Sequence, residues 1–341
     1  MVFDRLTHPI VQAPMGGGPS TPELAIAVSQ AGGLGFLAAA YRNADDVGAE
    51  IDQVRAATDQ AFGVNVFVPR RDEVDEEALR GFVERLGPDV GEPLWDDDGW
   101  EAKIELLRRA AVPVVSFTFA CPPEDVIRPL RAAGSEVWVT VASAADAATA
   151  ARAGADALVV QGYEAGGHQG PWSDGDDLER LGLLALLRLV AAETDLPLVA
   201  AGGIADGAAL AAALAAGARA AQIGTAFLLA PEAGTHPEHR AALTEDVPTA
   251  LTRAFTGRTA RGIVNGFIRE HTDAPIAYPQ IHHATSPLRA EARKQGDRDA
   301  FNLWAGQAHR LTREAPAADI VRALSADARA ALRRAAERFA D

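Results

Sequence analysis

Short apolar runs alternate along the chain with longer segments whose apolar residues recur with a helical period. Short runs rich in branched side chains are typical of buried strands, and the longer segments are typical of amphipathic helices. This alternation predicts βα units around a parallel sheet. The strand candidates are residues 9–12, 34–38, 63–67, 112–117, 136–141, 157–161, 196–200 and 220–223. Because about eight such units close a barrel, we expect an α/β protein with a (β/α)8 TIM barrel.

Capping residues mark the beginnings of two predicted helices. Thr21 followed by Pro22 opens the first helix, and Asp206 opens a later one. Side chains of these types accept hydrogen bonds from the first free backbone amides of a helix, and proline is favoured at its first position. The stretch 208–230 is apolar enough to resemble a membrane span, but it is rich in alanine and interrupted by Arg219. We interpret it as a buried helix followed by a buried strand, and expect no membrane association.

Two parts of the chain extend beyond the barrel pattern. The acidic segment 70–98 follows the third strand and is long enough to cover the barrel mouth. A polar block punctuated by proline follows the eighth strand and precedes a last helix near residues 325–340. The sequence therefore predicts a barrel and a second, smaller, mostly helical lobe, formed by residues 1–225 with 305–341 and by residues 226–304.

Charge and cysteine content narrow the class of partner. The chain has 47 acidic and 32 basic residues, a net charge of −15, so its surface repels nucleic acid and anionic lipid. We expect a small-molecule partner. The single cysteine, Cys121, allows no internal disulfide, and the first residues hold no apolar stretch of signal-peptide length. We expect a cytoplasmic protein, and the sequence does not indicate its oligomeric state.

Small residues follow the seventh and eighth predicted strands. The first of these loops contains Gly202 and Gly203, and the second runs from Gln222 to Thr225. Glycine lets backbone N–H groups approach an anion closely, and in TIM barrels phosphate binds at these two loops. Glycines that simply turn the chain are the alternative. The presence of both loops favours a phosphate site.

The glycine-rich loop 161–170 follows the sixth predicted strand and contains one histidine, His168. A neutral imidazole accepts a proton near neutral pH, so His168 is a candidate general base. The alternative is a structural histidine whose ring is bonded to the backbone. Catalytic groups of parallel barrels lie at the carboxyl ends of the strands, which favours the catalytic interpretation.

Two further side chains and two glycine clusters are also candidates for a functional site. Asn65 lies in an apolar strand, where its amide needs a partner, either a cofactor or the backbone. Cys121 is either a nucleophile or a small residue lining the site, and we favour the second because no signature places it beside His168. The clusters 16–18 and 33–35 lack the patterns of a P-loop and of a Rossmann turn.

Four histidines outside the barrel pattern are possible metal ligands. No carboxylate accompanies them in an arrangement typical of metal sites, and the His-Glu-x-x-His motif is absent. We therefore interpret them as surface residues and expect no metal. They are His236, His239, His282 and His283.

Five segments, taken together, resemble a known family. In order and spacing they are similar to the motifs of the nitronate monooxygenases, formerly called 2-nitropropane dioxygenases, over about the first two thirds of the chain. They are residues 12–15, 62–65, 161–168, 200–204 and 222–225. The resemblance implies an FMN-containing barrel that oxidises alkyl nitronates with O2 to a carbonyl compound and nitrite. It also suggests propionate 3-nitronate as a substrate.

The resemblance also implies roles for individual residues. His168 carries over as the catalytic histidine, which deprotonates a neutral nitroalkane or holds the anion. The segments 256–262 and 303–307 are similar to the family too, and in the first of them we expect Arg258 and Arg261 to pair with acids. The residues implied to contact FMN are Met15, Asn65, Gln161, Gly166, Gly203, Gln222, Ile223, Gly224 and Thr225.

Two competing functions fit the same features. The Gly-Gly-His loop also resembles flavin-dependent enoyl-acyl-carrier-protein reductases and NADH:quinone reductases, in which a nicotinamide supplies electrons. A non-catalytic barrel that binds phosphate or flavin is the third possibility. Reduction of the flavin by NADH or NADPH distinguishes the reductases from the monooxygenase.

Overall fold

The computed structural model describes residues 1–339, and its centre is a barrel of parallel strands. Hydrogen bonds between Leu34 and the chain around Ile10 and Gln12 join the first strand to the second and close the barrel. Every predicted strand is confirmed, although some boundaries move by up to two residues. The barrel strands are β1 (Ile10–Gln12), β2 (Gly35–Ala38), β3 (Phe62–Phe67), β4 (Val114–Thr118), β5 (Glu136–Val141), β6 (Ala157–Gln161), β8 (Leu198–Ala201) and β9 (Ala220–Ile223).

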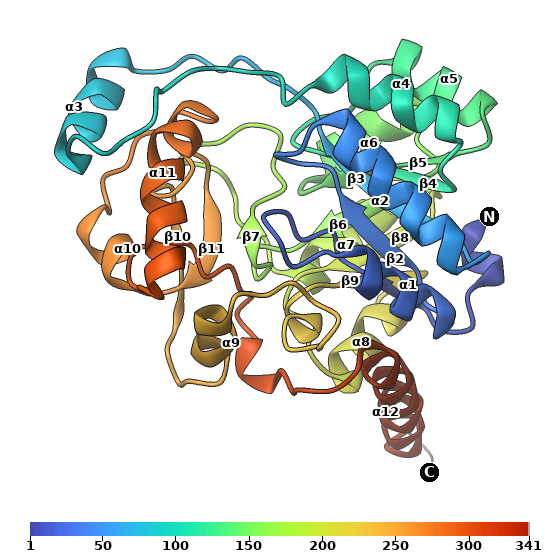
Figure 1. The fold of residues 1–341 in the computed structure, drawn as a ribbon. Coiled ribbons are helices and arrows are strands. Elements are labelled where there is room, and N and C mark those ends of the chain that lie inside the picture. The colour runs from blue at the N-terminus through green and yellow to red at the C-terminus, as the bar shows by residue number, and fades with distance from the viewer. Residues whose placement is uncertain (340–341) are drawn as a thin grey trace.

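Helices surround this barrel in the order expected of βα units (Figure 1). Both predicted caps are present: Thr21 Oγ1 accepts a bond from the Leu24 amide, and Asp206 Oδ1 accepts one from the Ala209 amide. The surrounding helices are α1 (Pro22–Gln30), α2 (Ala44–Ala57), α4 (Trp100–Ala110), α5 (Glu124–Ala132), α6 (Ala144–Ala153), α7 (Leu183–Glu193), α8 (Gly207–Ala215) and α12 (Ala317–Glu337).

Two sequence interpretations bear on these helices. The last helix begins at Ala317, directly after Pro316, which is earlier than predicted, and residue 340 of the predicted range lies outside the described residues. The apolar stretch 208–230 forms most of α8 and all of β9, as predicted. Among residues 1–339, no helix is both long and apolar enough to cross a bilayer.

The barrel interior is filled by apolar side chains toward its amino-terminal end. Trp138 on β5 is fully buried there, packed against Phe36 and stacked on Phe3 at 4.9 Å between ring centroids. Phe3 belongs to a short 3-10 helix, η1 (Val2–Arg5). A stacked aromatic pair stabilises the fold by about 0.5–1.5 kcal/mol beyond the contribution of its buried surface area. This packing closes one end of the barrel, so a ligand enters at the carboxyl ends of the strands.

The second lobe lies beside the barrel, on the left in Figure 1. Its helix α3 (Glu76–Leu86) comes from the acidic segment after β3, and Leu79 and Phe82 share a buried cluster with Phe255 and Ile281. The helix of that segment thus packs into the lobe rather than over the barrel mouth, because its apolar face finds partners there. The other helices of the lobe are α9 (Pro237–Leu243), α10 (Gly266–Glu270) and α11 (Gln280–Gln295).

A small antiparallel sheet joins the lobe to the barrel. Its strands are β10 (Thr249–Thr252), β11 (Ala260–Ile263) and β7 (Gly167–His168), in the order β10-β11-β7. The hydrophobic pattern did not predict this sheet, since its strands have two to four residues and no clear alternation. Its edge strand β7 lies within the glycine-rich loop after β6, so the lobe holds that loop directly.

Candidate functional site

A cavity of about 330 Å³ lies at the carboxyl ends of the barrel strands, between the barrel and the lobe. Volumes of this size are typical of small-molecule sites. Residues from strands and loops far apart in sequence converge on it. Nearly every residue predicted from the sequence lines it: Met15, Asn65, Gln161, Gly166, His168, Gly203, Gln222, Gly224 and Thr225.

Ile223 is the exception among the predicted residues. Side chains alternate between the two faces of a strand, so Gln222 points into the barrel mouth and Ile223 points outward. Its side chain is 1% exposed and packs in the cluster between the strands and the helices. The Ile223 side chain does not line the cavity, so only its backbone is placed to contact a cofactor there.

The loops after β8 and β9 form a cradle of small residues. Gly203 has a φ of +70°, and a Cβ there would lie 3.1 Å from the Cβ of Glu164. Both features favour glycine. Thr225 begins the 3-10 helix η2 (Thr225–Phe227), and its Oγ1 accepts a bond from the Gly306 amide at 3.0 Å. The hydroxyl proton of Thr225 is therefore available to an anion in the cradle.

Two amide side chains in the cavity have acceptor atoms to spare. Asn65 donates from Nδ2 to Ser116 and Thr118, but its Oδ1 accepts no hydrogen bond from the described residues. Gln222 Oε1 is buried and likewise has no partner among them. A buried acceptor without a partner is unfavourable. These oxygens suit a ligand that offers N–H or O–H groups.

The barrel and the lobe hold His168 from both sides. Strand β7 pairs with β11 so that His168 lies opposite Ala260, and its Nε2 lies 3.0 Å from Thr256 Oγ1. Four aromatic rings surround the imidazole, with centroids 5.5–6.0 Å away. They belong to Phe67, Phe119, Tyr278 and Trp304. The ring is therefore fixed in orientation within a largely apolar enclosure.

The hydroxyl of Thr256 determines which nitrogen of His168 carries the proton. Thr256 Oγ1 lies 3.2 Å from the carbonyl oxygen of Arg258, and a carbonyl only accepts. Since the hydroxyl has one proton, donating it there leaves Thr256 to accept from Nε2–H of His168. We infer that the neutral imidazole carries its proton on Nε2. Its Nδ1 then has a free lone pair, and no described residue donates to it.

The surroundings of His168 disfavour its charged form. Burial, and then the positive charge of Arg258, lower the pKa of His168 from 6.5 to about 3. The imidazole is therefore neutral throughout the physiological pH range. It can accept a hydrogen bond or a proton at Nδ1, but it is a weak base.

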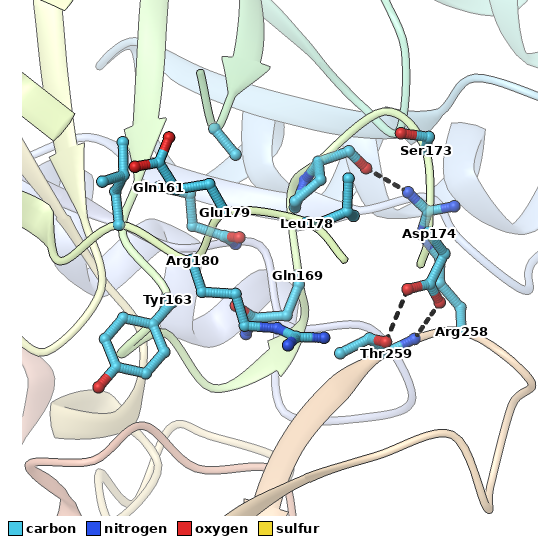
Figure 2. Close-up of a pocket in the computed structure, with 13 residues that line it drawn as sticks. Gln161, Tyr163, Gln169, Ser173, Asp174, Leu178, Glu179, Arg180, Arg258 and Thr259 are labelled. Atoms are coloured by element: carbon cyan, nitrogen blue, oxygen red, sulfur yellow. Dashed lines mark hydrogen bonds between the residues drawn. The ribbon is translucent and has the colours of Figure 1, made fainter. Parts of the chain in front are cut away.

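A carboxylate supports β11 behind the histidine. Figure 2 shows Asp174 beside Thr259, whose amide and hydroxyl each donate to it at 2.7 Å. Burial opposes the charge of Asp174, but these bonds and the guanidinium of Arg253 outweigh it and lower its pKa. Gln161 lines the small hollow shown in Figure 2 and also lines the main cavity, so the two spaces share this residue. Asp174 thus anchors the strand that pairs with β7.

The four histidines expected at the surface differ in how deeply they are buried. His239 is 6% exposed, and its Nε2 bonds to the Trp304 carbonyl at 3.1 Å. His236, His282 and His283 are half-buried, and His282 stacks on Tyr41 with 4.0 Å between the ring centroids. The surface interpretation is wrong for His239, because α9 packs its inner face against the chain around Trp304. Within residues 1–339, no three His, Cys, Asp or Glu side chains group as metal ligands do.

The expected acid partners of two arginines are also absent from the described chain. Arg258 donates to the Pro171 carbonyl and lies 4.0 Å above the Phe119 ring, and Arg261 donates to the Tyr163 carbonyl at 2.9 Å. Both guanidinium groups bind backbone carbonyls and so tie the lobe sheet to the loops after β6. The expectation of ion pairs is wrong for both residues.

Cys121 does not line the cavity. Its side chain is half-buried and packs at the margin of the two clusters between strands and helices. Burial raises the pKa of its thiol to about 11, so it is a poor nucleophile at neutral pH. Neither the catalytic nor the lining interpretation holds.

Several residues that line or support the site were not predicted. Most come from the lobe and reach the cavity only through the fold, so no local pattern marks them. Two segments gave a signal: 256–262 contains Thr256 beside the two arginines already noted, and 303–307 contains Trp304. The unpredicted residues are Tyr41, Thr256, Tyr278, Arg293, Asn302 and Trp304.

Comparisons with known proteins agree with this geometry. A family model described as nitronate monooxygenase matches residues 2–327. A nitronate monooxygenase of Pseudomonas aeruginosa is 40% identical, over 94% of this chain and 97% of its own length. A probable nitronate monooxygenase of Bacillus subtilis is 38% identical, over 91% and 92%.

Solved structures give the same picture. A structure of nitroalkane oxidase from Streptomyces ansochromogenes superposes with a TM-score of 0.95 at 48% identity, covering 98% of this chain and 99% of that one. A structure of FabK from Thermotoga maritima superposes with a TM-score of 0.79 at 30% identity, covering 99% and 97%.

Proposed function

This chain belongs to the nitronate monooxygenase family, and on that premise we propose that it is an FMN-dependent enzyme that oxidises alkyl nitronates with O2. The products are a carbonyl compound and nitrite, and propionate 3-nitronate is a proposed substrate. The observation that carries this proposal is a neutral histidine facing a cavity whose floor is a cradle of glycines.

The donor and acceptor groups of the cavity fit FMN. Gly203, Gly224 and the hydroxyl of Thr225 suit its phosphate, and the unpartnered oxygens of Asn65 and Gln222 suit polar edges of its ring system. Met15, Gln161 and Gly166 complete the proposed contacts, and Ile223 contributes only backbone. When bound there, FMN supplies the redox chemistry that takes electrons from the nitronate and passes them to O2.

His168 then acts on the substrate with its free Nδ1. An imidazole with a pKa of about 3 removes a proton from a neutral nitroalkane slowly, because the best general bases have pKa values near the working pH. A preformed nitronate needs no such step. The positive charges of Arg258 and Arg289, which lie near His168, also attract a nitronate anion. We therefore propose that preformed nitronates are the preferred substrates.

Steady-state assays test this function. Purified protein should be yellow, or become yellow on addition of FMN, and should release nitrite from propionate 3-nitronate much faster than it oxidises NADH. The competing reductase function predicts the opposite ratio of rates. A protein that stays colourless in excess FMN would exclude both flavoenzyme functions and leave the non-catalytic barrel.

A further inference from the structure

The cavity has a second wall that the proposed chemistry does not use. It is formed by α11 and by the segment 301–304, and it contributes Arg293, Phe301 and Asn302 to the lining. His236 holds this wall in place, since its Nε2 bonds to the Arg293 carbonyl at 3.1 Å and its Nδ1 accepts from the Glu238 amide at 3.2 Å. Both ring nitrogens of His236 are therefore engaged, and the wall is fixed rather than adaptable.

The guanidinium of Arg293 has donors to spare. Its Nη2 donates to Asn302 Oδ1 at 2.8 Å, and the group lies 5.0 Å above the Phe301 ring. A guanidinium has N–H groups on all three nitrogens, and no other bond joins those of Arg293 to the described protein. Arg293 is half-buried and lines the cavity. Its remaining N–H groups are thus available to a ligand.

Asn302 presents a donor at the same place. Its Oδ1 accepts from Arg293 and, at 3.4 Å, from Arg289. Two cationic donors on one oxygen fix the orientation of the amide, so the Nδ2–H2 group points away from them. That group donates to no described residue, and Asn302 lines the cavity. Arg293 and Asn302 together therefore offer a charged and a neutral donor.

The charge of this wall has no carboxylate counterpart among residues 1–339. Arg289 is 7% exposed and donates only to Thr285, His282 and Asn302. The side-chain partners of Arg289 and Arg293 among the described residues include no carboxylate. Burying a charge without an opposite charge nearby is unfavourable. The chain has 47 acidic residues, yet none of the described ones pairs with these two arginines. An anion supplied from outside balances such a wall.

We propose that Arg293 and Asn302 form a subsite for a carboxylate at the end of the substrate opposite its nitronate group. Arginine suits this task because its planar donors match both oxygens of a carboxylate. The inference rests on the proposed function and narrows its substrate class to nitronates that carry a second anionic group. A phosphate shares this chemistry, so the cofactor is the other possible source of the anion.

Nitrite release from two nitronates tests the subsite. Propionate 3-nitronate carries the carboxylate, and propyl 1-nitronate has a methyl group in its place. We expect Arg293→Gln to raise KM about tenfold or more for the first and less than about twofold for the second, with kcat little changed. Arg293→Lys should restore part of the loss. Arg298→Gln is the matched control, because Arg298 pairs with Glu245 at the lobe surface.

Two binding measurements complete the test without turnover. The Kd of 3-nitropropionate and of 1-nitropropane for the FMN-loaded protein, measured by calorimetry, should differ in the same way between wild type and Arg293→Gln. The Kd of FMN should be equal in the two proteins. Equal changes for both nitro compounds, no change for either, or a weakened FMN complex would overturn the subsite.

The calorimetry also separates this inference from the function on which it rests. If wild-type protein releases no nitrite from either nitronate, the proposed function fails. In that case a loss of 3-nitropropionate binding in Arg293→Gln, with 1-nitropropane binding unchanged, still supports the anion subsite.

Discussion

His168 is kept uncharged by its surroundings, and this sets what it can do. The aromatic enclosure removes water from the imidazole, and nearby arginines repel its proton. Such a group serves as a hydrogen-bond acceptor and a weak base. It has no charge of its own with which to attract the proposed nitronate, so in our proposal the arginines around it provide that attraction.

Replacing His168 by Asn separates these roles. Asn keeps a polar side chain of similar reach but removes the base, so turnover of neutral nitroalkanes should fall by about 10²–10⁴-fold. Turnover of preformed nitronates should fall much less, because no proton has to be removed. Nitrite release from 1-nitropropane and from its preformed nitronate measures the two effects. Equal losses for both would remove the base role.

Thr256 positions His168 without contacting substrate. Thr256→Val keeps the shape but removes the hydroxyl, so the Nε2–H tautomer loses its anchor and the ring can turn. We expect kcat with nitroalkanes to fall about fivefold while KM stays nearly constant, since one hydrogen bond contributes about 1 kcal/mol. Thr256→Ser should restore the rate. A serine variant as slow as the valine variant would indicate that the side chain serves packing alone.

The small sheet β10-β11-β7 couples the lobe to the chemistry. Because His168 itself belongs to β7, any displacement of β11 moves the imidazole. Helix α3 stabilises the lobe that carries this sheet, because Phe82 is fully buried in the cluster that also contains Phe255.

Truncation of Phe82 tests the attachment of α3. Phe82→Ala removes a buried ring, and such changes cost about 3–5 kcal/mol. Urea denaturation should show a loss of this size in the free energy of unfolding or a separate early transition of the lobe. Leu332→Ala on α12 is a control, because its side chain is 40% exposed. Similar small losses in both variants would mean that α3 is not part of the lobe core.

The sequence predicted elements well where a pattern repeats and poorly where pairing is between distant segments. The barrel strands and their glycine loops have local signatures, and so does His168 within its glycines. Strand β7 has two residues and exists only because β11 lies beside it. Arg293 and Asn302 have no signature for the same reason: their function depends on the packing of α11 against the segment 301–304.

Buried neutral histidines make the whole molecule sensitive to acid. Burial lowers the pKa of His168 to about 3, of His239 to about 4 and of His282 to about 2. In the unfolded chain these groups titrate near 6.5, so below that pH the unfolded state binds more protons than the native state. The free energy of unfolding therefore falls as the pH drops from about 6.5, by up to about 1.4 kcal/mol per pH unit for each histidine.

Denaturation at several pH values measures this loss. Between pH 6.5 and 5, we expect the free energy of unfolding from urea titrations to fall by at least about 2 kcal/mol. His239→Gln should reduce the slope, because it removes one of the histidines whose pKa is lowered in the native state. A stability that is constant over this range would contradict the buried neutral state of these rings.

The most direct measurement is anaerobic mixing of the FMN-loaded protein with a possible electron donor in a stopped-flow instrument. Propionate 3-nitronate should bleach the flavin absorbance rapidly, and readmitted O2 should restore it with release of nitrite. NADH and NADPH should bleach it slowly or not at all. Rapid bleaching by a nicotinamide, with none by the nitronate, would contradict the proposal that this protein is a nitronate monooxygenase.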